Sequence, residues 1–94
     1  MTEDLRIAHD PDASRYEIFV GDAVAGFAEY EVHGSIMTFT HTVTSPHLRG
    51  RGLASRVVQF ALDDARKHGF TVVPRCWYVA QFIDEHPEYA NLLE

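Results

Sequence analysis

The chain has 94 residues, of which 46% are hydrophobic and 23% charged, a composition typical of one small globular domain over residues 1–94. No apolar run is long enough to span a membrane, and the acidic start does not have the pattern of a signal peptide. The formal net charge of −6 argues against a nucleic-acid binder. A single cysteine, Cys76, excludes an intramolecular disulfide and a cysteine-rich zinc site, so we expect a protein of the reducing cytoplasm.

The charges are unevenly distributed along the chain. No Asp or Glu lies between Glu31 and Asp63, and this interval holds three arginines and three histidines. A basic island in an acidic protein is either a site for an anion or a chance cluster, and the charge count alone favours neither.

The first half of the chain has the pattern of four strands joined by short turns. Apolar and polar residues alternate in these segments, or β-branched and aromatic residues gather in them. In the fourth strand the alternation predicts that Met37, Phe39, His41 and Val43 share one face. The expected strands cover residues 5–9, 16–20, 24–32 and 36–43.

The second half changes to the helical period. Apolar residues from Leu53 to Ala65 form one stripe, and Gly69 is the residue type expected just beyond the helix end. A short buried strand over 70–73 follows, which Pro74 should either stop or place at an opening in the sheet, and then a short helix over 78–83. A last turn begins at Pro87.

We expect the side chains of Trp77, Phe82 and Ile83 to lie in the core. The order of elements predicts an α/β (α+β) fold, with a mixed, mostly antiparallel sheet, one long helix and short C-terminal helices.

The segment PHLRGRGLA at 46–54 lies between the fourth strand and the long helix. Gly50 and Gly52 permit close approach of the backbone to a ligand, and the helix behind them directs unpaired N–H groups toward the same space. A phosphate or pyrophosphate suits this geometry. The third glycine of a dinucleotide-binding fingerprint is absent, because Ser55 stands there, and the lysine of a P-loop is absent too. The alternative is a loop that only turns the chain.

This segment resembles the acetyl-CoA pyrophosphate loop of the GNAT superfamily of N-acetyltransferases, and the whole chain is similar to the small single-domain GNAT-like proteins. The superfamily's opening Gln or Arg is His47 here. The resemblance implies a minimal GNAT-like fold with the long helix after the loop. The other matching stretches are GFAEY at 26–30, FTHTV at 39–43, ALDDAR at 61–66, VPRCWYV at 73–79 and HPEY at 86–89.

The resemblance also implies the cofactor, acetyl-CoA, and its place. The pantetheine arm would lie between two strands that splay apart and would pair with backbone at His41, Thr42 and Val43. The activity implied is transfer of the acetyl group to an amine acceptor. The pyrophosphate would bind the N–H groups of Arg49, Gly50, Arg51, Gly52, Leu53 and Ala54.

Four residues are candidates for the chemistry. Cys76 stands beside Arg75 at a predicted helix start, where a thiol is readily ionised. The related small proteins place a cysteine here, and this resemblance implies an acetyl-cysteine intermediate. The alternative is a buried, inert thiol. His41 is a candidate proton acceptor or else a core histidine. Tyr78 is a candidate proton donor to the leaving thiolate or else a packing aromatic, and Glu29 is a candidate base or else a surface carboxylate.

Two other functions remain open. One is a non-catalytic CoA or acyl-CoA-binding module that acts with a partner protein, and the other is a purely structural α/β interaction domain. No H-x-x-x-H or H-E-x-x-H pair occurs, so we do not expect a metal site. Small amines, polyamines, protein lysines and N-termini all remain open as acetyl acceptors.

Overall fold

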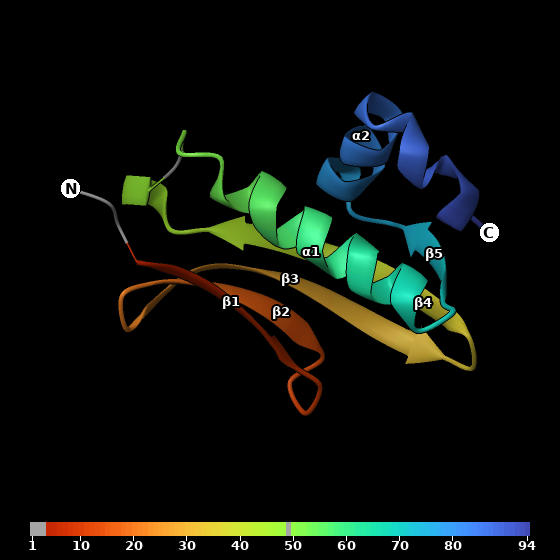
Figure 1. The fold of residues 1–94 in the computed structure, drawn as a ribbon, viewed down its shortest axis with the longest axis horizontal. Helices are drawn as coiled ribbons and strands as arrows, with labels where there is room; N and C mark the ends of the chain where they lie inside the picture. Colours follow the sequence, from red (N-terminus) through yellow and green to blue (C-terminus); the bar gives the residue numbers. More distant parts are fainter. Residues whose placement is uncertain (1–3, 49) are drawn as a thin grey trace.

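The computed structural model describes residues 4–48 and 50–94. Its strands form one sheet in the order of the chain, and the first four are antiparallel neighbours whereas the fifth is parallel to the fourth. The mixed, mostly antiparallel sheet with one long helix confirms the predicted fold class (Figure 1). The elements are β1 (Leu5–Asp10), β2 (Arg15–Val20), β3 (Ala23–His33), β4 (Ile36–Thr44), the short 3-10 turn η1 (Pro46–Leu48), α1 (Leu53–Lys67), β5 (Thr71–Pro74), α2 (Trp77–Glu85) and η2 (Pro87–Leu92).

The core lies on one face of the sheet. Helix α1 crosses this face and supplies the crossover that a parallel pair of strands requires. Its apolar stripe is buried against Tyr16, Ile18 and Phe39 of the strands. Helix α2 and the turn η2 pack against the same cluster beside α1 (Figure 1). None of the helices in the described part of the chain has the length and apolar character needed to cross a membrane.

A β-bulge in β4 changes which of its side chains face the core. Thr40 is the extra residue, because the neighbours on its two sides keep their register with β3. A bulge shifts the alternation by one residue, so Phe39 faces the core whereas the exposed His41 and Val43 lie on the opposite face. Thr42 takes the core-facing direction instead. The expectation that His41 and Val43 share the face of Phe39 is therefore wrong.

Helix α2 buries Val79, Phe82 and Ile83, and the prediction that the last two are core residues is confirmed. Trp77 is 73% exposed, so the same prediction is wrong for this residue. The physical reason is helical geometry, since Trp77 precedes the buried stripe by two positions, which corresponds to a rotation of about 200° around the helix axis.

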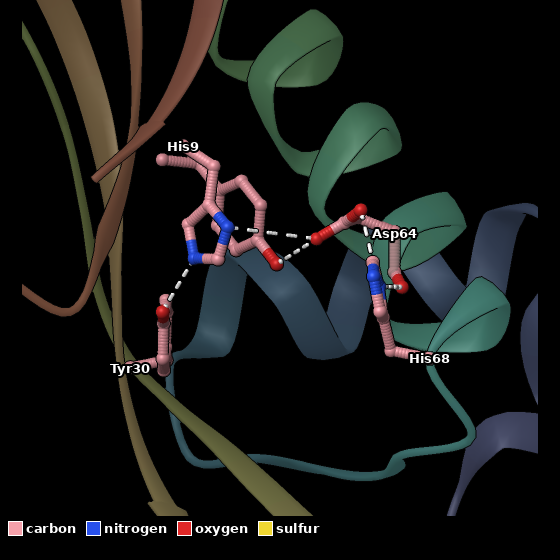
Figure 2. Close-up of polar contacts among 5 residues, drawn as sticks. His9, Tyr30, Asp64 and His68 are labelled. Carbon is pink, nitrogen blue, oxygen red and sulfur yellow. Dashed lines mark hydrogen bonds and ion pairs between the residues drawn. The ribbon is translucent and has the colours of Figure 1, made fainter. Parts of the chain in front are cut away.

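A polar cluster connects the N-terminal strands to α1 (Figure 2). The buried Tyr16 hydroxyl donates to Asp64 Oδ2 at 2.7 Å, and the ring of His9 stacks on the Tyr16 ring with 4.2 Å between centroids. His9 Nδ1 lies 3.7 Å from Asp64, its Nε2 lies 2.5 Å from the Tyr30 hydroxyl, and His68 Nδ1 lies 3.3 Å from the other Asp64 oxygen. Burial, followed by the Asp64 carboxylate, raises the pKa of both tyrosines, so their hydroxyls stay protonated at neutral pH.

Candidate functional site

The sheet opens at one end, between β4 and β5. Their register pairs stop at Phe39 and Pro74, and the Cys76 N–H then donates to the Phe39 carbonyl at 2.9 Å. Within the described residues, β4 continues to Thr44 with no β5 partner. Proline has no N–H for a further ladder bond, so the strand pair parts here. The opening expected after Pro74 is present.

The free edge of β4 presents backbone groups to this opening. The Ser45 N–H points at β3 and donates to a carbonyl of that strand at 2.8 Å. The Val43 carbonyl also points at β3, as shown by its oxygen, which would lie only 2.7 Å from a Cβ built on Gly26 of β3. Backbone directions alternate along a strand. The N–H and C=O groups of Thr42 and Thr44 therefore face the opening.

The loop before α1 leaves open space above its backbone. Gly50 and Gly52 have φ of +84° and +74°, a conformation that favours glycine, and a Cβ on either would meet no atom within 4 Å. Gly52 is the N-cap of α1 and its carbonyl accepts the Arg56 N–H at 3.2 Å. The first N–H groups of α1 have no partner inside the helix, and its first turn carries no acidic residue. This end of the helix therefore favours an anion.

A cavity of about 520 Å³ joins the opening of the sheet to this loop. Eight of the predicted site residues lie around it, whereas His41 and Arg51 are not among the described residues that line it, and Arg49 lies outside the described residues. The lining residues are Thr42, Val43, Thr44, Leu48, Gly50, Gly52, Leu53, Ala54, Cys76, Trp77 and Tyr78.

Cys76 is placed where a thiol can meet a ligand in the cavity. It is the N-cap of α2, as the predicted helix start implied, and it is 8% exposed. Its Sγ donates to Thr42 Oγ1 at 3.5 Å. For Thr42 the resemblance implied a backbone role only. Strict alternation would turn its side chain away from the core, and the bulge at Thr40 brings it toward Cys76 instead.

Tyr78, in the first turn of α2, is a weak acid in this setting. Burial raises the pKa of its hydroxyl, the charge of Glu85 adds to the shift, and a hydrogen bond with Ser55 opposes it. The phenol is therefore protonated at neutral pH and can only donate a proton, as its predicted role requires.

His41 lies on the face of the sheet opposite α1. Its Nδ1 is 3.2 Å from Glu29 Oε1, and the two side chains are 67% and 40% exposed. The residues are register partners on β3 and β4, so the sheet itself holds them together. His41 and Glu29, which the sequence offers as separate candidates, therefore form one pair.

A family model described as GCN5-related N-acetyl-transferase matches residues 15–92. Among curated proteins, Protein NATD1 of Bos taurus is 28% identical over 86 residues, which cover 88% of this chain and 75% of that protein. Protein NATD1 of Homo sapiens is 27% identical over the same length and with the same coverage.

The solved structures share the fold. A GCN5-like protein from Staphylococcus aureus superposes with a TM-score of 0.74 at 16% identity, covering 96% of this chain and 88% of that chain. The ribosomal-protein-S18-alanine N-acetyltransferase of Escherichia coli superposes with a TM-score of 0.59 at 19% identity, covering 62% of this chain and 38% of that chain. The fold and the match over residues 15–92 agree, and the chain belongs to the GCN5-related N-acetyltransferase family.

Proposed function

We propose that this protein binds acetyl-CoA and transfers its acetyl group to an amine. One observation carries the proposal: a single cavity connects the free backbone edge of β4, the open glycine loop and the thiol of Cys76. Each of the three suits a different part of the cofactor, and family membership supports the same assignment.

The loop suits the pyrophosphate. Gly50 and Gly52 leave room for phosphate oxygens to approach the backbone, and the N–H groups of Leu53 and Ala54 lie at the positive end of α1. Arg51 stands between the two glycines and adds positive charge to the loop. The interval without acidic residues spans this loop, so an anion site explains the charge distribution better than chance does.

The edge of β4 suits the pantetheine arm. The two amides of the pantetheine arm need hydrogen-bond donors and acceptors along an extended path. The backbone groups of Thr42 and Thr44 supply them at the opening of the sheet. Of the backbone expected to pair with the arm, at His41, Thr42 and Val43, only that of Thr42 faces this way. This arrangement would direct the thioester end of the arm toward Cys76.

When bound, acetyl-CoA supplies a thioester whose carbonyl carbon accepts a nucleophile. In direct transfer the amine nitrogen bonds to that carbon and the C–S bond breaks. The Tyr78 hydroxyl would protonate the leaving sulfur and would be restored by the proton that the nitrogen loses on forming the amide. His41 would take the proton that an ammonium acceptor loses before its attack. In the route through Cys76, the Sγ would bond to the acetyl carbon as the C–S bond of the thioester breaks. The amine would then take the acetyl group as the bond to Cys76 Sγ breaks, and a proton from the amine would return to the thiol. The thiol proton that Cys76 loses balances the one that the released CoA thiol gains.

Two measurements test the proposal. A thermal-shift titration with acetyl-CoA should stabilise the fold, by about 2.7 kcal/mol at a hundredfold excess over Kd. Intact mass after incubation with acetyl-CoA should show one added acetyl group that is absent in Cys76→Ala. No thermal shift would refute the cofactor assignment.

The alternative is a CoA-binding module without turnover. One observation favours it, because His41 does not line the cavity and a proton acceptor is needed for catalysis. It predicts a thermal shift with acetyl-CoA but no acetyl adduct and no transfer to amines. Release of CoA thiol on addition of spermidine to the wild-type protein and acetyl-CoA would exclude it.

A further inference from the structure

We infer that the amine acceptor reaches the acetyl group from the sheet face opposite α1, and that Glu29 positions His41 on that face to take the acceptor's proton. This inference rests on the proposed function. It also resolves the apparent misplacement of His41, because a base need not line the cofactor cavity if the acceptor comes from the other side.

The faces of the sheet separate the two reactants. On the core face, α1 and α2 pack against the strands, and the Cys76 thiol meets the core-facing Thr42. On the opposite face, Val43 is 45% exposed and is one of the residues that line the cavity, so this face borders the opening of the sheet. His41 precedes Val43 by two residues and shares its face. An acceptor on this face therefore passes His41 before it meets the acetyl group.

The Glu29–His41 pair has the geometry of an oriented base. With the carboxylate 3.2 Å from Nδ1, the favoured neutral form carries its hydrogen on Nδ1 and its lone pair on Nε2. A carboxylate holds an imidazole in the correct tautomer in this way in hydrolase triads. Glu29 acts through His41 and is therefore a positioning residue.

The charges around the pair favour a cationic amine. Arg15 is the register partner of Glu29 on β2, but its guanidinium lies 2.9 Å from Glu17 and 4.3 Å from the centre of the Phe27 ring. The carboxylate of Glu29, beside His41, is therefore the negative charge that the pair presents to an incoming acceptor. We therefore assign the acceptor to the class of primary alkylammonium compounds, which this face attracts and which must lose a proton before they react.

The transfer balances as follows. The ammonium gives one proton to His41 Nε2, and the neutral nitrogen bonds to the acetyl carbon while the C–S bond breaks. The second proton lost by the nitrogen balances the one that the leaving thiolate acquires. The imidazolium then returns its proton to water, so His41 is ready for the next cycle.

The test compares Glu29→Gln with a matched control, Glu31→Gln. Glu31 lies on the same strand and face and has its own histidine neighbour, since His33 Nε2 is 4.0 Å away. Spermidine is the acceptor, CoA thiol release gives the rate, and ¹⁵N chemical shifts of the ring nitrogens give the tautomer of His41. We expect Glu29→Gln to lower kcat about tenfold, which is part of the 10²–10⁴-fold rate enhancement typical of a general base. The Kd for acetyl-CoA should stay unchanged, and the hydrogen of neutral His41 should move away from Nδ1. Glu31→Gln should change none of the three.

Other results show whether the role of Glu29, the acceptor class or the proposed function is wrong. Equal kcat in both variants, or a His41 tautomer that does not respond to Glu29→Gln, would overturn the role of Glu29. If the wild-type protein binds acetyl-CoA but releases no thiol with spermidine, the assigned acceptor class is wrong. If it binds no acetyl-CoA, the proposed function fails, and the tautomer measurement still decides whether Glu29 orients His41.

Discussion

Replacing Gly52 with aspartate places a carboxylate where the cofactor phosphates are expected. A Cβ at this position meets no atom within 4 Å, so the protein itself can accommodate the side chain. The φ of +74° costs a non-glycine residue about 1 kcal/mol of stability. A carboxylate close to two phosphates costs about 2 kcal/mol of binding energy at an effective dielectric constant between those of water and protein. Gly52→Asp should therefore raise the Kd for acetyl-CoA about thirtyfold.

Gly69 provides the control for this prediction. It follows α1 at its other end, has a φ of +78°, and a Cβ there also meets no atom within 4 Å. Gly69→Asp places its carboxylate at the negative end of α1, so it should cost at least as much stability in urea unfolding as Gly52→Asp. It should nevertheless leave the Kd for acetyl-CoA, measured by isothermal titration calorimetry, within twofold of wild type. Added salt should narrow the difference between the two variants, because it screens the added charge. Equal Kd values for Gly52→Asp and Gly69→Asp would refute the assignment of the loop to the pyrophosphate.

Three further predictions concern the framework of the site. Burial and a hydrogen bond to a carboxylate raise the pKa of Tyr89 to about 12. The stability that its hydroxyl contributes is therefore complete below pH 10 and is lost as the pH rises toward 12. The difference in urea unfolding free energy between wild type and Tyr89→Phe should shrink over this range, and a constant difference would contradict this prediction. Tyr16→Phe removes the donor to Asp64 and should lower the unfolding free energy by about 2 kcal/mol without changing the Kd for acetyl-CoA, whereas weaker binding would show that the polar cluster reaches the site. Gly26→Ala brings a Cβ to 2.7 Å from the Val43 carbonyl, so it should lower stability by about 1–3 kcal/mol and weaken acetyl-CoA binding, and wild-type values for both would disprove the close approach of β3 and β4.

The helices and strands could be predicted because each depends on a pattern of apolar residues, or on a proline, within its own segment. The alternation over 36–43 and the helical stripe from Leu53 to Ala65 correspond to β4 and α1, and Pro74 ends β5 as predicted. These signals depend only on neighbours within a few residues. The unusual backbone of the glycine loop could be predicted for the same reason, since positive φ at Gly50 and Gly52 is a local property.

The bulge at Thr40 could not be predicted from the alternation. It exists because β4 carries one residue more than β3 between two register pairs, and no pattern within β4 alone records the length of its partner. Its effects are large, because it moves His41 to the face of Glu29 and brings Thr42 to Cys76. The polar cluster around Asp64 was missed for a related reason, since its members come from segments far apart in the chain (Figure 2).

The most direct test of the account is a titration of the ¹⁵N-labelled wild-type protein with acetyl-CoA, followed by amide chemical shifts. If the cavity holds the cofactor, the largest changes fall on residues of separate elements that line it: Thr42, Thr44, Gly50, Gly52 and Ala54. A titration that changes no amide shifts, or that changes only those of residues around Asp64 at the far end of α1, would contradict it.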